Sequence, residues 1–151
     1  MKLLPILFTA SLFLACNSEK KKDQNTSSSE EFTISDNLQQ EKVSESFARG
    51  KEVFSNFCVT CHLPSGKGIP GNFPPLAGSN WLVDKRTESL KAIKYGLSGP
   101  IEVNGESYNN VMAPQGLSDQ EVADVMNYIS NSWGNSSKKE VTIEEVKAIS
   151  K

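Results

Sequence analysis

The five-residue run Cys58-Val59-Thr60-Cys61-His62 constrains this chain more than any other feature of its sequence. In a helical turn, residues three and four positions apart lie on the same side, so the two thiols and the imidazole project together. Two thiols in that arrangement can reach both vinyl groups of one porphyrin while the imidazole points at the iron. The run therefore predicts one covalently bound haem c, attached through Cys58 and Cys61, with His62 as an axial ligand of the iron.

A cysteine pair with this spacing has two other uses, a redox-active disulfide and a zinc site. A thioredoxin-like motif does not need His62, and it belongs to an α/β fold whose strands the sequence pattern does not predict. A zinc site needs two more ligands, and the chain has only Cys16 besides this pair and no second histidine. Haem attachment is the remaining interpretation of Cys58, Cys61 and His62.

Residues 1–15 have the pattern of a secretory signal peptide. Lys2 is the only charged residue before Glu19, and an apolar run follows it as far as Ala15. A membrane-spanning helix would need roughly 20 apolar residues, and this run is shorter. We therefore expect the leader to be cleaved and the mature chain to be exported to the periplasm of the cell envelope.

Cys16 follows the leader directly, and Leu14-Ala15-Cys16 resembles the lipobox of bacterial lipoproteins. This resemblance implies cleavage before Cys16 and lipid on its thiol, which would anchor the protein to a membrane. The following residues, to about residue 40, are polar and bury too little apolar surface to order themselves. Segment 16–40 is therefore predicted to be a lipidated, disordered tether. The alternative is a simple cleaved signal that leaves Cys16 as a spare thiol.

Apolar periodicity predicts an all-α domain at residues 41–135, followed by an extension at 136–151. The expected elements are helices at residues 43–57, 87–95 and 119–133, a β-hairpin at 101–108, and a short helix that begins with a capping box at Thr142. Another capping box at 118–121 precedes the third helix, and Asn-Gly at 104–105 is a hairpin-turn signal. The net charge of -2 gives no indication of a nucleic-acid partner.

The single histidine also limits the choice for the second axial position of the iron. Of the three methionines, Met1 leaves with the leader, and Met126 lies on the apolar stripe of a predicted helix, where methionine usually only packs. Met112 lies in loop 109–116, from which a thioether can fold over the open haem face and raise the iron's potential relative to bis-imidazole ligation. Met112 is therefore the predicted sixth ligand. The alternative is a buried loop anchor beside an open or water-bound iron.

Pro74 is expected to orient the ring of His62. A ligating imidazole usually donates its other N–H to a carbonyl, which fixes both its tautomer and its direction. The ring of Pro74 fixes its own φ, and Pro75 holds its ψ extended, so the Pro74 carbonyl is a pre-set acceptor. The alternative is that these two prolines only stiffen a loop.

From about residue 44 to residue 134, the chain resembles the class I cytochrome c family. The residues that match its motifs are Cys58, Cys61, His62, Pro74, Leu76, Gly78 and Met112. The resemblance implies the class I cytochrome c fold, with three to five helices around one covalent haem. It also implies that Gly50 and Phe54 pack against Tyr128, which would explain a glycine that costs a helix about 1 kcal/mol relative to alanine. The alternative is that Gly50 is merely a weak point in its helix.

This resemblance implies a mono-haem cytochrome that passes single electrons in a bacterial envelope respiratory chain. The protein is then no enzyme, because His62 and Met112 leave no open position on the iron. Its expected partners are redox proteins such as a membrane dehydrogenase, oxidase or reductase, and it is expected to be a monomer. The alternatives are a fixed cytochrome subunit of an oxidase, nitrite reductase or dehydrogenase complex, and a haem enzyme or gas sensor with open iron. No crowd of lysines surrounds the attachment run, which argues against docking to an acidic partner.

Overall fold

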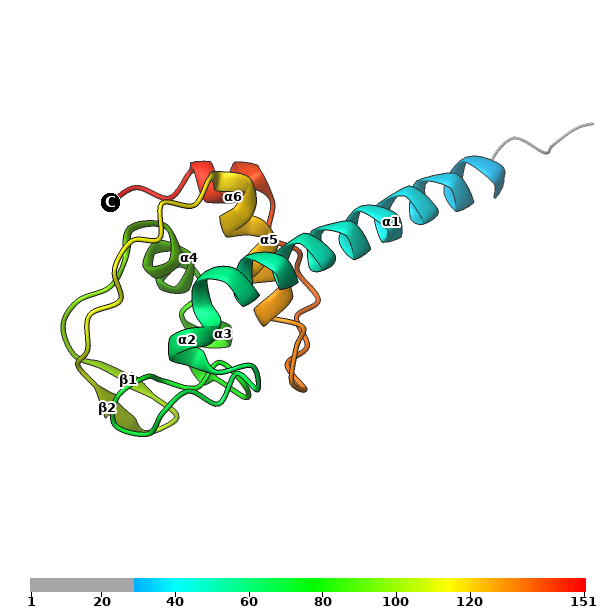
Figure 1. Ribbon diagram of the computed structural model, residues 1–151. Coiled ribbons are helices and arrows are strands. Elements are labelled where there is room, and N and C mark those ends of the chain that lie inside the picture. The colour runs from blue at the N-terminus through cyan, green and yellow to red at the C-terminus, as the bar shows by residue number, and fades with distance from the viewer. Residues whose placement is uncertain (1–28) are drawn as a thin grey trace, which may run out of the picture.

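The computed structural model describes residues 29–151, so the predicted signal peptide and Cys16 lie outside the described part. The elements are α1 (Ser29–Val53), η1 (Phe54–Cys58, a π-helical turn), α2 (Val59–His62), α3 (Asn80–Asp84), α4 (Arg86–Tyr95), β1 (Ile101–Val103), β2 (Glu106–Tyr108), α5 (Asp119–Ile129) and α6 (Ile143–Lys147). Helices form the body, and one two-stranded hairpin lies at its edge (Figure 1). The predicted all-α fold with a small hairpin is confirmed. Within residues 29–151, no helix is both long and apolar enough to cross a lipid bilayer.

Helix α1 begins well before the predicted start of the domain. The polar composition predicts a disordered tether as far as residue 40, but the structure places residues 29–40 in the helix. No proline or glycine interrupts the chain between Ser29 and Arg49, so a helix that packs at its C-terminal end can propagate through polar sequence. The N-terminal half of α1 projects from the body (Figure 1). Gln39 lies in this half, and its Nε2 donates a hydrogen bond to Oε2 of Glu140 at 2.9 Å.

The C-terminal half of α1 crosses α5 at Gly50. A Cβ on Gly50 would overlap the carbonyl oxygen of Asp124 and lie 2.8 Å from the Cβ of Tyr128. One turn later, the rings of Phe54 and Tyr128 pack with their centroids 5.5 Å apart. The glycine is therefore explained by close helix contact, as the family resemblance implies, and it is not a weak point in the helix.

A buried carboxylate locks the same crossing. Asp124 is 2% exposed. It accepts hydrogen bonds from Arg49 Nε at 2.7 Å and from Ser46 Oγ at 2.6 Å, both on α1. A buried charge is costly unless it is paired and hydrogen-bonded, so this set of partners holds α1 in a single register on α5.

Helix α5 ends earlier than the sequence predicts. The pattern suggests an end near Trp133-Gly134, but the helix stops at Ile129. Side chains donate hydrogen bonds to the carbonyl oxygens of its last turn. Ser132 Oγ donates to Tyr128 O at 2.7 Å, and Asn135 Nδ2 donates to Ile129 O at 2.8 Å. Because these acceptors are satisfied, the chain can leave the helix. It then turns through Trp133 and Gly134, whose φ angles are 53° and 89°.

The hairpin forms as predicted, with Ile101 paired to Tyr108 in an antiparallel register. Its turn residues Asn104 and Gly105 have φ angles of 52° and 81°, and two positive values are what a tight hairpin turn requires. The backbone N–H of Asn104 donates to Oδ1 of Asn80 at 2.8 Å, and the Asn80 N–H donates back to Asn104 Oδ1 at 2.9 Å. This reciprocal pair docks the hairpin on α3, a short helix that the sequence pattern did not predict.

The extension at 136–151 packs back onto the domain and contains the predicted short helix, α6. Val141 and Val146 are 2% and 0% exposed and belong to the main apolar core. Arg86, at the start of α4, donates to the carboxylate of Glu145 through Nε at 2.7 Å and Nη2 at 2.9 Å. The extension therefore helps to fix α4 in place.

Candidate functional site

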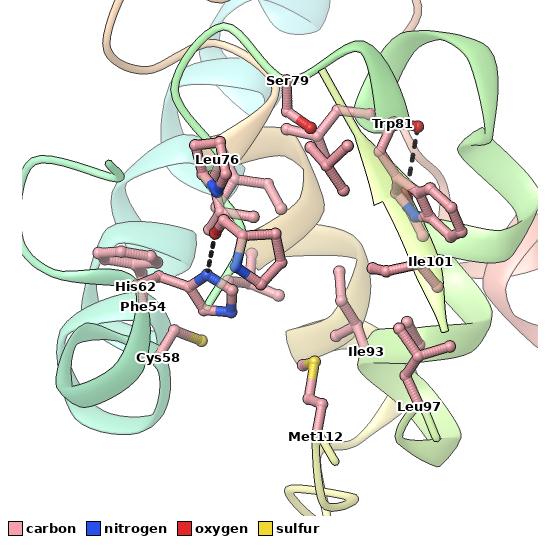
Figure 2. A pocket seen from close by; sticks show the side chains of 18 of the residues that line it. Phe54, Cys58, His62, Leu76, Ser79, Trp81, Ile93, Leu97, Ile101 and Met112 are labelled. Carbon is pink, nitrogen blue, oxygen red and sulfur yellow. Dashed lines mark hydrogen bonds between the residues drawn. The ribbon is translucent and has the colours of Figure 1, made fainter. Parts of the chain in front are cut away.

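The attachment run lies where the long helix α1 gives way to η1 and α2. A π-helical turn adds one residue to a helix and so rotates everything after it by about 100°. The turn is anchored by Phe54, which is 2% exposed and packs against Trp133 with ring centroids 5.0 Å apart. Figure 2 shows the Cys58 sulfur and the His62 imidazole directed into one space. Cys61 lines the neighbouring opening of that space.

The orientation of His62 is set by a backbone acceptor. Its Nδ1 lies 3.0 Å from the carbonyl oxygen of Pro74, the acceptor that the sequence predicts (Figure 2). A carbonyl only accepts, so Nδ1 carries the proton, and Nε2 keeps its lone pair for a metal. Burial lowers the pKa of His62, and the bond to Pro74 opposes this only in part. The imidazole is therefore neutral at pH 7, the form that ligates iron.

The loop that carries the Pro74 carbonyl is itself held by short-range contacts. The amides of Leu76 and Ala77 both donate to the carbonyl of Gly66, at 2.7 and 2.9 Å. Gly68 has a φ of 61°, and a Cβ there would lie 2.6 Å from the carbonyl oxygen of Pro74. Only a residue without a side chain therefore lets the backbone pass this close to the Pro74 carbonyl.

Met112 reaches the same space from a loop rather than from a helix. Its backbone pairs with Leu97, N–H to carbonyl in both directions, at 2.8 and 2.9 Å. Gly96 lies beside this pair, and a Cβ there would meet the Met112 carbonyl oxygen at 2.6 Å. Figure 2 shows the thioether pointing towards the gap in front of the His62 ring. Met126 is 0% exposed within the apolar core, so it has the packing role that the sequence predicts.

Between His62 and Met112 lies a cavity with an empty volume of about 710 Å³, part of it open to solvent. Its apolar lining comes from η1, α3, α4, β1, α5 and the loops between them, and it includes Phe54, Pro75, Leu76, Leu82, Ile93, Leu97, Ile101, Val103, Leu117, Val125 and Ile129. Of the described residues that line it, none is an Asp, Glu, Lys or Arg. An apolar slot with a neutral imidazole and a thioether aimed into it, and with thiols at its edge, suits a haem.

The cysteines do not behave as a redox pair. Burial, together with the smaller effect of the neighbouring Cys61, raises the pKa of the Cys58 thiol to about 11. A catalytic disulfide needs a depressed thiol pKa, because the thiolate is the nucleophile. Within residues 29–151, no group of three or more His, Cys, Asp or Glu side chains is placed to hold a metal ion. Both alternatives to haem attachment therefore lack support.

Two positions in the site carry no sequence signal that could have revealed them. Leu97 is the backbone partner of Met112, but it precedes it by a whole hairpin, and any residue except proline could make these bonds. Asn135 accepts from the Gly78 N–H at 2.8 Å and donates to the Leu76 carbonyl at 2.8 Å. It thereby ties the loop that follows Pro74 to the end of α5, a role that only the fold reveals.

Comparisons with known proteins match this chain to cytochromes c. The cytochrome c family model matches residues 47–133. Cytochrome c-552 of Thermus thermophilus is 41% identical over 111 residues, which covers 68% of this chain and 84% of that protein. The cytochrome c subunit of the quinone-dependent alcohol dehydrogenase of Gluconobacter oxydans is 32% identical over 104 residues, 66% of this chain and 21% of that subunit. The gluconate 2-dehydrogenase cytochrome c subunit of Pantoea cypripedii is 32% identical over 108 residues, 68% of this chain and 24% of that subunit.

Proposed function

Because this chain belongs to the cytochrome c family, and is thus a mono-haem electron-transfer protein, we propose that it works as a lipid-anchored electron carrier. The observation that carries this proposal is the position of Met112, whose thioether points towards the ring of His62 across an apolar cavity (Figure 2). Two protein ligands leave iron without a site for substrate, so electrons are all that the centre exchanges.

When bound, the haem supplies the chemistry, a one-electron change of its iron between the ferric and ferrous states. Cys58 and Cys61 would hold it through thioether bonds, and His62 and Met112 would ligate its iron. The apolar walls exclude water and lower the local dielectric, which together with the thioether ligand sets the potential. The pre-set carbonyl of Pro74 keeps the imidazole in one orientation, so the site needs little rearrangement when an electron arrives or leaves.

A haem enzyme is the less suitable interpretation of this site. Peroxidase-like chemistry needs an acid–base group above an open iron. In the described chain, the wall of the cavity around Met112 contains no Asp, Glu, Lys, Arg or second His. A gas sensor likewise needs an open position, which the thioether of Met112 would fill.

A stand-alone carrier and a fixed subunit would use the same haem site. Cytochrome c-552 supports the first, because this chain matches 84% of its length. The dehydrogenase subunits support the second, but this chain matches only 21% and 24% of their lengths. We therefore favour a small monomeric carrier that exchanges electrons with membrane-bound redox proteins, over a permanent subunit.

Carbon monoxide tests whether the iron is closed. The purified ferrous protein should bind the gas slowly or not at all, because the thioether of Met112 must leave before the gas can enter. Rapid binding, followed by the shift of the haem absorption, would mean an open sixth position and would favour the sensor or enzyme. Reversible reduction and oxidation of the same sample controls for an intact haem.

The proposed anchor is tested separately, by mass spectrometry of the mature N-terminus isolated from membranes of the native host. We expect the chain to begin at Cys16 and to carry the mass of attached acyl chains. The matched control is Cys16→Ser, which should release the protein into the soluble fraction with its haem intact. A mature chain that retains Cys16 as an unmodified thiol would end the lipoprotein proposal.

A further inference from the structure

The loop that carries Met112, residues 109–116, has little support of its own. Six of its eight residues are exposed, and within the described chain its backbone is bonded to the backbone of one distant residue, Leu97. Leu97 comes two residues after Tyr95, which ends α4. The position of the thioether over the haem cavity therefore depends on the position of the C-terminal end of α4.

The C-terminal extension binds that end of α4. The hydroxyl of Tyr95 donates to the carbonyl oxygen of Ile149 at 2.9 Å. Figure 1 shows the last segment of the chain, in red, running beside α4. Lys151 lines a surface hollow that Tyr95 and Met112 also line. The extension thus reaches the segment that leads from α4 into Leu97.

Lys94 connects the extension to the helix that follows the loop. Its Nζ donates to the carbonyl oxygen of Val146 at 2.9 Å and lies 2.9 Å from Oδ1 of Asp119. Asp119 is the first residue of α5 and comes three residues after the loop. The Lys94 side chain is only 16% exposed, so these two partners offset the hydration that its ammonium group loses. Lys94 and Tyr95 together join the extension to both segments that border the loop.

The extension is itself well anchored in the domain. Val141 and Val146 belong to the main apolar core, and Ile149 packs against that core. The backbone N–H of Val141 donates to Oδ1 of Asn127, on α5, at 2.7 Å. A segment with buried side chains and buried hydrogen bonds opens less readily than an exposed loop. The extension can therefore restrain the loop.

From these contacts we infer that Lys94 and Tyr95 are positioning residues for the sixth ligand, and that residues 146–149 form a clamp on both. The clamp fixes the end of α4, and Leu97 passes this restraint to the backbone of Met112. The inference rests on the proposed ligation of iron by Met112. An extension that only completed the core would stabilise the whole domain alike, whereas a clamp acts on the Met112 side of the cavity.

The mildest test is Tyr95→Phe in the haem-loaded protein, because it removes only the hydroxyl that binds Ile149. Loss of one neutral hydrogen bond should raise the rate of carbon monoxide binding to the ferrous protein by about fivefold, since the loop opens more often. Hydrogen exchange at the amides of Leu97 and Met112, followed by NMR, should accelerate by about the same factor. This second measurement reports the loop directly and needs no added ligand.

Lys94→Leu should have the larger effect, about tenfold or more in both measurements, because it leaves the Asp119 carboxylate and the Val146 carbonyl without their shared partner. Lys94→Arg keeps a cationic donor and should return both rates to within about twofold of the unsubstituted protein. If Lys94→Leu does not fold, Tyr95→Phe decides the question by itself.

Glu145→Gln is the matched control, because it loosens the same extension at the opposite end of α4, where Glu145 binds Arg86. Carbon monoxide binding and the exchange of the Leu97 and Met112 amides should stay within about twofold of the unsubstituted protein. The free energy of unfolding, measured in urea for all the variants, shows whether the control and Tyr95→Phe lose similar stability.

Two results would overturn the inference. Unchanged carbon monoxide binding and amide exchange in Tyr95→Phe would mean that α4 holds the loop without the extension. Equal acceleration in Tyr95→Phe and Glu145→Gln would mean that the extension only stabilises the domain as a whole. The proposed function fails in a different way, if the unsubstituted protein itself binds carbon monoxide rapidly.

Discussion

The two sides of the haem cavity are built in different ways. On the His62 side, the proposed ligand and the proposed attachment cysteines lie within one helical turn, and the orienting carbonyl of Pro74 is only twelve residues away. On the other side, Met112 lies in a loop, and its backbone is paired with Leu97, which belongs to the segment after α4. One side is local in sequence, and the other is assembled from distant segments.

This difference teaches where the site can fail. A local turn with covalent attachment keeps its ligand close to the iron even when the surrounding structure loosens. A ligand on a loop stays in place only while the elements beneath that loop hold their positions. We therefore expect disturbance of the fold to open the Met112 side first, and the following variants test this expectation.

The largest effect is expected from replacing the two proposed ligands, His62 and Met112. His62→Ala should abolish normal maturation, with covalent haem, measured as the pyridine haemochrome, falling by about tenfold or more. Met112→Ala should retain covalent haem but bind carbon monoxide rapidly, and its potential should fall by about 100 mV or more, since loss of the thioether withdraws its preference for ferrous iron. Equal loss of haem in both variants would contradict the proposed difference between the His62 side and the Met112 side of the cavity.

Met126→Ala is the control for loss of a methionine as such. Met126 is fully buried in the core, so its truncation should cost about 2–5 kcal/mol in the free energy of unfolding. The folded variant should nevertheless exclude carbon monoxide as the unsubstituted protein does. Rapid binding by this variant would show that any core disturbance opens the iron.

A matched pair of glycine substitutions compares the two sides without touching a ligand. Gly96 and Gly78 have φ angles of 80° and 64°, so alanine is strained at both and should cost about 1–2 kcal/mol in stability. A Cβ at Gly96 would also press on the Met112 carbonyl, whereas a Cβ at Gly78 meets nothing within 4 Å. Only Gly96→Ala should therefore weaken the methionine–iron charge-transfer absorption of the ferric protein and admit carbon monoxide. The same spectrum in both variants would mean that Gly96 does not support Met112.

The smallest effect is expected in the extension, where Glu145 helps to hold α4. Its hydrogen bonds to Arg86 lower the pKa of Glu145 in the folded protein below that of the unfolded chain. The contribution of this carboxylate to stability is therefore complete above the unfolded pKa, and it is lost as the pH falls through the folded pKa. Glu145→Gln should cost about 1 kcal/mol or less at pH 7 in urea unfolding, and the difference should shrink on acidification below about pH 4. A difference that is independent of pH would exclude the ion pair as its cause.

The features that could be predicted from the sequence are again the local ones, and those that depend on distant segments were missed. The hairpin at residues 101–108 and the capping of α5 by Ser118 were predicted, because each depends on a few adjacent residues. The end of α5 was predicted wrongly, because it is decided by side chains beyond the helix, above all Asn135. The disordered tether was predicted too long, because helix propagation from the packed end of α1 overrides a polar composition.

The sequence by itself predicted the cofactor and its proposed attachment, since Cys58, Cys61 and His62 meet within one helical turn in any helix. It also restricted the choice of the proposed sixth ligand. The chain has no second histidine, and of its methionines only Met112 lies in a predicted loop of the domain. Only the tertiary structure decided how that loop is held over the cavity, through the backbone pairing of Met112 with Leu97. The physical reason is that local spacing fixes the relative positions of neighbouring side chains, whereas a cavity and its rim exist only once distant segments have packed together.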